Sequence, residues 1–167
     1  LQTSPEYHMK RLLAAGAPSI VRIGPVFRAE EMGALHNPEF TMIEWYRRDF
    51  DLAALMDEVR SLVNLLLGAA PFRRISYFQL LYEGAGVDPW LSSDDDLSRA
   101  LQRLGIELSP ATNPTRRDRL DLLAAHMMDH LGAGRIFVTD YPADQAALAR
   151  VVVGDQGREL AQRFELI

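Results

Sequence analysis

Two extended runs on either side of a turn-rich segment constrain the fold of this chain more than any other feature. "SIVRIGPVFRAE" (19–30) and "FTMIEWYRRDF" (40–50) are rich in β-branched and aromatic residues, whereas "EMGALHNPE" (31–39) carries glycine, asparagine and proline. This order predicts an antiparallel hairpin over residues 19–50 with a wide tip. Gly24 and Pro25 are expected to interrupt the first strand, because glycine and proline weaken strand interiors.

Side chains of a strand alternate between two faces, so the pattern assigns different chemistry to each side of this hairpin. One face of the second run is amphiphilic and suits a ligand with an apolar stem and a positive end: Phe40, Met42, Glu44 and Tyr46. Ile43 and Trp45 lie on the opposite face and are expected to pack in a core against helices. On the first run, Arg28 offers a fork of donors suited to a phosphate or carboxylate.

The remaining pattern mixes helices with strands. Helices are expected over residues 3–17, 51–68, 92–105 and 115–132, and strands near 135–142 and 157–167. Residues 73–86 are expected to begin extended and then turn helical. Thr3 and Glu6 have the spacing of a capping box, and the acidic run 93–96 is expected to be a solvated helix start. The fold class is therefore α+β, with an antiparallel sheet flanked by helices, rather than repeated βαβ units.

Composition excludes several functional classes. The chain has 167 residues, a formal net charge of −5 and no cysteine, so it has no overall basic surface for nucleic acid and no disulfide or thiolate metal site. No apolar run reaches the length of a membrane span, and the start carries no signal-peptide pattern. We expect a cytoplasmic protein with no membrane partner.

The hairpin sequence resembles a specific family. "FRAEE" and "HNPEFTMIEWY" resemble motif 2 of the lysine-type class II aminoacyl-tRNA synthetases, and "TSPEYHMKRLLAAG" resembles the segment that precedes this motif. The resemblance implies that residues 1–167 are part of a class II catalytic domain, with the motif 2 region at 19–50. Motifs 1 and 3 are expected outside this chain. The family also implies a homodimer for the full-length protein.

Two branches of the family are compatible with these motifs: the lysyl-tRNA synthetases and their shortened paralogues, the elongation factor P–(R)-β-lysine ligases. The "SPEYHMK" spelling, Trp45 and "DYPADQAALARV" (140–151) resemble the paralogues more closely. That branch implies that β-lysine, or lysine, is activated with ATP as an adenylate and transferred to a lysine of elongation factor P, with tRNA an unlikely partner. A tRNA-charging core and a truncated, non-catalytic binding module are the alternatives.

The resemblance implies roles for ten residues. Those expected to contact ATP are Arg28, Glu30, His36, Asn37 and Phe40, with Arg28, the catalytic residue, on the α-phosphate and the activated carboxylate, and Phe40 stacked on adenine. Those expected to contact the amino acid are Ser4, Pro5, Glu6, Glu44 and Tyr46. No metal ligand is expected within this chain, since the family's Mg²⁺ ligands would lie outside it. The chain alone is therefore expected to bind ATP weakly and to be inactive.

Overall fold

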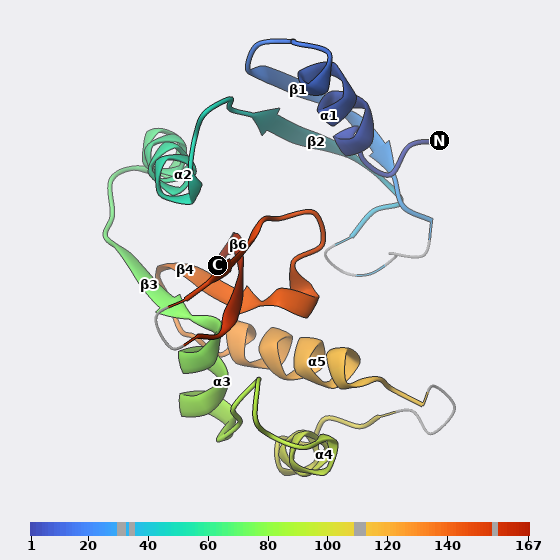
Figure 1. Ribbon diagram of the computed structural model, residues 1–167, viewed down its shortest axis with the longest axis vertical. Coiled ribbons are helices and arrows are strands. Elements are labelled where there is room, and N and C mark those ends of the chain that lie inside the picture. The colour runs from blue at the N-terminus through green and yellow to red at the C-terminus, as the bar shows by residue number, and fades with distance from the viewer. Residues whose placement is uncertain (30–32, 34–35, 109–112, 155–156) are drawn as a thin grey trace. The chain divides into compact units, whose positions relative to one another are not determined.

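The computed structural model describes residues 1–29, 33, 36–108, 113–154 and 157–167 (Figure 1). Contacts between residues divide the chain into two compact units, Leu1–Leu55 and Met56–Ile167. All residues with a site role in the sequence-based prediction belong to unit 1. Each unit is described by itself.

Unit 1 is built on the hairpin. Strands β1 (Ile20–Phe27) and β2 (Glu39–Tyr46) pair antiparallel along their full length, which confirms the predicted hairpin. The expected interruption at Gly24 and Pro25 is wrong, because β1 continues through both residues and Pro25 lies opposite Thr41. Both strands of a two-stranded sheet are edge strands, so the missing N–H of a proline can face away from the partner.

Helix α1 (Glu6–Ala14) lies beside the hairpin (Figure 1). Its predicted capping box does not form: Pro5 is the N-cap residue, and it has no side-chain cap. The hydroxyl of Ser4 instead accepts a hydrogen bond from the backbone N–H of Glu6 at 3.0 Å, and the Glu6 carboxylate binds Lys10. The helix ends before Gly16, which has a φ of +96°.

The two faces of the hairpin differ in burial. Val26 is fully buried and Met9 of α1 nearly so, and both belong to the side of the sheet that α1 covers. On the opposite side, Val21 and Ile23 are each 66% exposed and Ile43 is 54% exposed. The predicted core around Ile43 is therefore wrong within this chain, because α1 packs on the other face.

Helix α2 (Leu52–Leu67) contains the boundary between the two units. As predicted, Asp51 caps its start, with Oδ1 accepting from the backbone N–H of Ala54 at 2.8 Å. At its end, Nη1 of Arg135 donates to the side-chain oxygen of Asn64 at 2.7 Å and to the carbonyl of Gly68 at 2.8 Å. A cation at this end also suits the helix dipole.

Unit 2 contains a four-stranded sheet in the order β3-β4-β6-β5. Its strands are β3 (Phe72–Ser76), β4 (Arg135–Pro142), β5 (Val151–Val153) and β6 (Glu159–Leu166), and the turn η1 (Ala143–Gln145) follows β4. The β4–β6 and β5–β6 pairs are antiparallel, but β3 and β4 are parallel. The chain between these two strands forms three helices that return it to the same end of the sheet, so the sheet is mixed within an α+β fold.

Those three helices are α3 (Tyr77–Ala85), α4 (Asp94–Arg103) and α5 (Arg116–Asp129). Helix α3 packs against β4, and α5 packs against both α3 and α4 (Figure 1). Their inward side chains form the main core of the unit, with these members almost fully buried: Tyr77, Leu81, Leu97, Leu101, Leu120, Leu123 and Val138. Each of these helices begins with a capping box: Ser76 with Gln79, Ser93 with Asp96, and Thr115 with Asp118.

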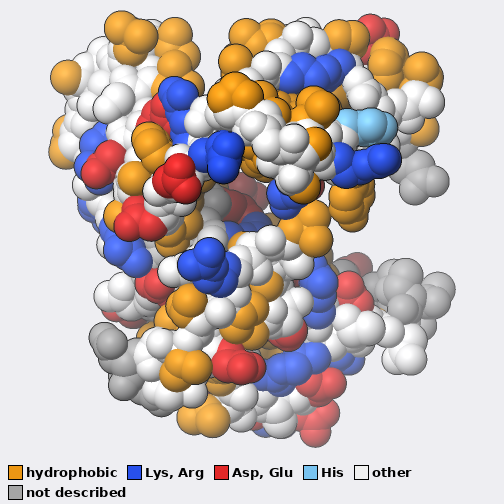
Figure 2. Space-filling view, turned by 45° about the horizontal axis from the view of Figure 1, so that its top comes forward, with side chains coloured by type: hydrophobic (Ala, Val, Ile, Leu, Met, Phe, Trp, Pro, Cys, Tyr) orange, Lys and Arg blue, Asp and Glu red, His pale blue; other side chains and the backbone are white. Residues whose placement is uncertain are grey.

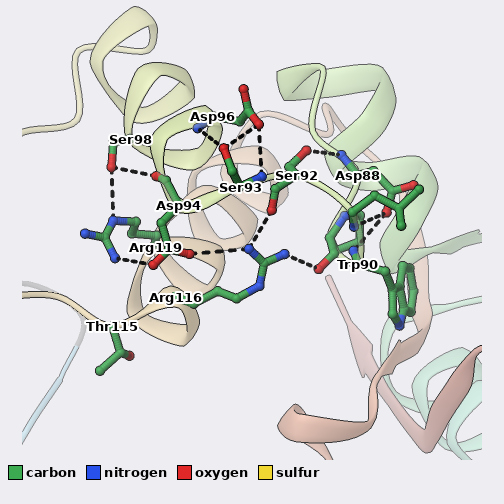
Figure 3. Close-up of polar contacts among 12 residues, drawn as sticks. Asp88, Trp90, Ser92, Ser93, Asp94, Asp96, Ser98, Thr115, Arg116 and Arg119 are labelled. Carbon is green, nitrogen blue, oxygen red and sulfur yellow. Dashed lines mark hydrogen bonds and ion pairs between the residues drawn. The ribbon is translucent and has the colours of Figure 1, made fainter.

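The acidic start of α4 is a helix terminus, as predicted, and it also connects two helices. Hydrogen bonds from Ser93 hold the pKa of the Asp96 carboxyl down at about 2. Asp94 accepts from Arg116 at 3.4 Å and pairs with Arg119 at 3.7 Å, and both arginines come from α5 (Figure 3). These contacts fix the start of α4 against the start of α5.

Hydrophobic side chains are visible among the charged ones on the face drawn in Figure 2. Large apolar residues that are more than two thirds exposed include Leu65, Leu67 and Val153. Across the described residues, however, no helix combines the length and apolar character that a bilayer crossing requires.

Leu123 and Leu122 provide a matched test of the unit 2 core. Leu123 is fully buried and Leu122 is 40% exposed on the same helix. Leu123→Ala should lower the free energy of unfolding by about 2–5 kcal/mol, since it leaves a cavity in a packed core. Leu122→Ala should cost less than about 1 kcal/mol. Urea unfolding of the chain measures both, and equal losses would contradict the packing described.

Candidate functional site

The inner face of the hairpin, which α1 covers in part, carries the candidate site. Register pairs Arg22 with Glu44, Gly24 with Met42, and Val26 with Phe40. Because the side-chain period of a strand is two residues, these rows all lie on one side of the sheet. Arg28 follows the end of β1 and donates its backbone N–H to the carbonyl of Pro38 at 2.8 Å, which continues the pairing by one residue.

Glu44 is the centre of a hydrogen-bonded group at one end of this face. Its Oε2 accepts from the hydroxyl of Ser4 at 2.8 Å, and its Oε1 accepts from the hydroxyl of Tyr46 at 2.6 Å. The structure thus brings together three of the five residues predicted to contact the amino acid. The fourth, Pro5, is buried at the start of α1.

Glu6, the fifth of these residues, has a cationic partner within α1. Its Oε1 lies 2.7 Å from Nζ of Lys10, one turn further along the helix. The same ammonium lies 5.9 Å from the ring centroid of Tyr46. The ammonium of Lys10 therefore lies between a carboxylate and an aromatic ring. The ammonium of a basic amino acid could make the same two contacts.

The pKa of Tyr46 is raised well above its usual range. Partial burial is the main cause, followed by the hydrogen bond to Glu44 and the negative charges of Glu44 and Glu6. The phenol therefore keeps its proton at any physiological pH and acts as a donor to Glu44. A neutral hydroxyl that is oriented in this way holds the carboxylate in one position.

Arg28 and Phe40 meet at the other end of the face. The guanidinium carbon of Arg28 lies 5.4 Å from the ring centroid of Phe40, which is a cation–π distance. Nε of Arg28 also lies 3.5 Å from the carbonyl oxygen of Thr3, at the limit of a hydrogen bond. The two residues predicted to bind the α-phosphate and the adenine are therefore neighbours, on the same side as Glu44.

The hairpin tip carries the remaining predicted contacts. His36 and Gly33 exchange two backbone hydrogen bonds of 3.2 Å, and His36 and Asn37 are both exposed. Glu30 lies outside the described residues. The nucleotide roles of these three residues stay predictions.

Two basic residues of the site were not identified from the sequence. Lys10 pairs with Glu6, a partner four residues away that helical spacing alone would have indicated. Arg22 shares the parity of Arg28 on β1, so strand alternation would have placed it on the inner face. Arg22 was not identified because it precedes the motif. Lys10 was not identified because a lysine on a helix is usually exposed to solvent.

Metal binding receives no support from the described residues. Among them, no group of three or more histidine, aspartate or glutamate side chains is arranged to hold a metal ion. His126 and His130 lie one turn apart, with ring centroids at 4.3 Å, and Nδ1 of His130 is 2.7 Å from the carbonyl oxygen of His126. The expected location of Mg²⁺ ligands outside this chain stays a prediction.

The hairpin presents a guanidinium, an aromatic ring and a carboxylate on one face. Its sequence resembles motif 2 of the class II synthetases. The family model of the class II tRNA synthetases (D, K and N) matches residues 1–167. The chain belongs to this family.

The curated relatives narrow the comparison. The chain is 42% identical over 168 residues to a protein of Yersinia enterocolitica named elongation factor P–(R)-β-lysine ligase. It is 44% identical over 169 residues to the protein of that name from Pseudoalteromonas translucida. Both alignments cover 99% of this chain but 51% of the relative, so the chain spans about half the length of these relatives. The resemblance to this branch of the family is confirmed.

Tyr46 provides a test of the acidic end. Glu44→Gln removes one negative charge beside the phenol, so the pKa of Tyr46 should fall toward its ordinary value and the ring should ionise at lower pH. Titration by NMR of the tyrosine-labelled chain, with Tyr46→Phe for assignment, measures the shift. Glu39→Gln, at an exposed position on the outer face, is the control. An unchanged Tyr46 titration in Glu44→Gln would contradict the contact.

Proposed function

We propose that the polypeptide containing this chain is an ATP-dependent ligase that activates a lysine-type amino acid, β-lysine in the first instance, and transfers it to a lysine of elongation factor P. The observation that carries the proposal is the common face of Arg28, Phe40, Glu44 and Tyr46. Had Arg28 and Glu44 pointed to opposite sides of the hairpin, one substrate could not have reached both. The names of the relatives supply the acceptor.

In the proposed first step, a carboxylate oxygen of the amino acid attacks the α-phosphorus of ATP. The bond from that phosphorus to the bridging oxygen breaks, and pyrophosphate leaves with the electron pair. Negative charge builds at the α-phosphate, where Arg28 would stabilise it. Mg²⁺, when bound, would offset the charge of the leaving phosphates, and its ligands are expected outside this chain.

In the second step, a neutral lysine amine of the acceptor attacks the carbonyl carbon of the adenylate. AMP leaves, and the amine loses a proton as the amide forms. Because the acceptor itself is the nucleophile, the enzyme needs no covalent intermediate. Positioning and electrostatic stabilisation therefore account for most of the catalysis that we assign to this site.

The amino-acid end of the site would bind the ammonium group of the substrate. Glu44 is held by two hydroxyls, and Glu6 already binds an ammonium from Lys10. A substrate amine would add a charge-assisted hydrogen bond to Glu44 or displace Lys10 from Glu6. Phe40 would stack on adenine with the ring face that Arg28 does not cover.

A lysyl-tRNA synthetase activity is the second candidate, because the matching family model covers enzymes of that kind. The activation chemistry would be the same, and only the acceptor would differ. A non-catalytic binding module is the third. The chain alone, at half the length of its relatives, is proposed to bind ATP weakly and to be inactive.

Arg28 provides the test of activation. In the intact gene product, Arg28→Gln should reduce amino-acid-dependent ATP–pyrophosphate exchange by about 10²–10³-fold, since one fixed donor to the developing charge is lost. Arg48→Gln removes the same charge from an exposed position after β2 and should leave exchange unchanged. Equal rates in the wild type and Arg28→Gln would refute the role.

Mass spectrometry of elongation factor P tests which molecule accepts the activated amino acid. Intact-mass spectrometry of elongation factor P after incubation with the gene product, ATP and (R)-β-lysine should show the addition of one β-lysyl group. Charging of tRNA with α-lysine under the same conditions, without modification of elongation factor P, would favour the synthetase instead. Absence of both, together with no pyrophosphate exchange, would favour the binding module.

A further inference from the structure

Lys10 of α1 is the only lysine among the 167 residues of this chain, and the other side chains with a permanent positive charge are arginines. A lysine side chain ends in a compact ammonium, which is also the group at the end of a lysine-type amino acid. A guanidinium is planar and binds through a fork of donors, so an arginine does not reproduce this chemistry. Lys10 is therefore the side chain of this sequence that most resembles the end of the proposed substrate.

The ammonium of Lys10 lies at the acidic end of the inner face. Its Nζ is 2.7 Å from Oε1 of Glu6 and 5.9 Å from the ring centroid of Tyr46. The hydroxyl of the same ring donates to Glu44 at 2.6 Å. We call the space between Glu6 and Tyr46 the ammonium site. In the structure, Lys10 makes the contacts there that an ammonium of the substrate would make.

The charge of Glu6 acts on the hairpin face as well as on Lys10. It is one of the causes that raise the pKa of Tyr46, after partial burial and the effects of Glu44. A lysine four residues after a glutamate on a helix is common, and by itself it would indicate only a surface ion pair. The ring of Tyr46 distinguishes this pair, because it connects the pair to the strand that carries Glu44.

The ion pair of Lys10 with Glu6 is open to solvent and easily separated. The side chain of Lys10 is 37% exposed and that of Glu6 is 39% exposed. Exposed ion pairs contribute little to stability, because water and salt screen them and because ordering two long side chains costs entropy. The flexible stem of a lysine also lets its ammonium turn into water while the helix stays in place. A second ammonium can therefore replace that of Lys10 at low cost.

We propose that Lys10 is an internal competitor for the amino group of the substrate. In the empty protein its ammonium occupies the ammonium site. When a lysine-type amino acid binds, the side chain of Lys10 turns out to solvent, and the distal ammonium of the substrate takes its place between Glu6 and Tyr46. This assignment rests on the proposed function and adds a residue that sets the specificity of the same site.

Competition of this kind favours cationic substrates. An analogue in which a methyl group replaces the distal ammonium cannot take over the contact with Glu6, so Lys10 stays in the ammonium site and opposes its entry. The competitor also lowers the apparent affinity for the correct substrate. Only the fraction of molecules in which the ammonium site is free can bind it, and the measured constant is the intrinsic constant divided by that fraction.

Lys10→Met keeps an apolar stem and removes the ammonium, which gives a test with a distinctive sign. In the intact gene product, the KM for the amino acid in ATP–pyrophosphate exchange should fall by about two- to sixfold, the factor by which an exposed ion pair keeps the ammonium site occupied. Loss of a residue that binds the substrate would raise this KM instead. Arg11→Met removes an exposed positive charge from the next position of the same helix and should leave the KM unchanged.

Chemical labelling of Lys10 measures the displacement directly. A short pulse of an acetylating reagent, followed by peptide mass mapping, gives the reactivity of Lys10 relative to the α-amine of the same polypeptide. Saturating amino acid should raise this relative reactivity by the same factor of about two to six, since both measurements depend on the fraction of molecules in which Lys10 is unpaired. The analogue that lacks the distal ammonium should leave the relative reactivity unchanged.

Three results would overturn the role of Lys10. The first is a KM that stays the same or rises in Lys10→Met. The second is an equal fall of the KM in Arg11→Met, which would show a general effect of charge. The third is a Lys10 reactivity that stays the same or falls with saturating amino acid, which would show that the substrate does not displace the ammonium.

The proposed function is tested separately by the wild type. If wild-type exchange saturates with a lysine-type amino acid while one of these three results is obtained, the proposed function stands and only the role of Lys10 is refuted. If the wild type supports no exchange with any lysine-type amino acid, the proposed function and the role of Lys10 both fall.

Discussion

The register of β1 with β2 is the constraint on which the rest of the candidate site depends. A shift of one residue would move every side chain of one strand to the other face. Glu44 would then lose Ser4 and Tyr46, and Phe40 would leave Arg28. Helix α1 is attached to the same face through Ser4 and through the carbonyl of Gln2, which accepts from Phe27 at 3.0 Å. The pairing of β1 with β2, the position of α1 and the geometry of the candidate site therefore depend on one another.

The acidic end is balanced in charge rather than simply negative. Glu6 and Glu44 each carry a formal negative charge, and Lys10 and Arg22 bring two positive charges to the same face. An amine that enters must compete with Lys10 or add to the hydroxyls on Glu44. Under the proposed function, selectivity for a lysine-type substrate would then arise from hydrogen-bond geometry more than from net charge.

Local signals accounted for much of the fold. Asp51 before a periodic helix, the acidic run 93–96 at a helix start, and glycines after the helices mark ends that the structure confirms. The Thr3 box does not form, because Pro5 is the N-cap residue and the backbone N–H of Glu6 donates to the hydroxyl of Ser4 rather than of Thr3. Whether β3 pairs parallel with β4 is decided by how three intervening helices pack, and no local pattern encodes it.

By itself, the sequence determined the hairpin, the face shared by Phe40, Glu44 and Tyr46, and membership of the class II synthetases, since alternation and motif spacing are local properties. The tertiary structure alone decided which face α1 covers, the hydroxyls that hold Glu44, and the unmatched Nη1 of Arg22. Hydrogen bonds join donors and acceptors that are distant in the chain. Their pairing depends on distances of a few tenths of an ångström that no residue order specifies.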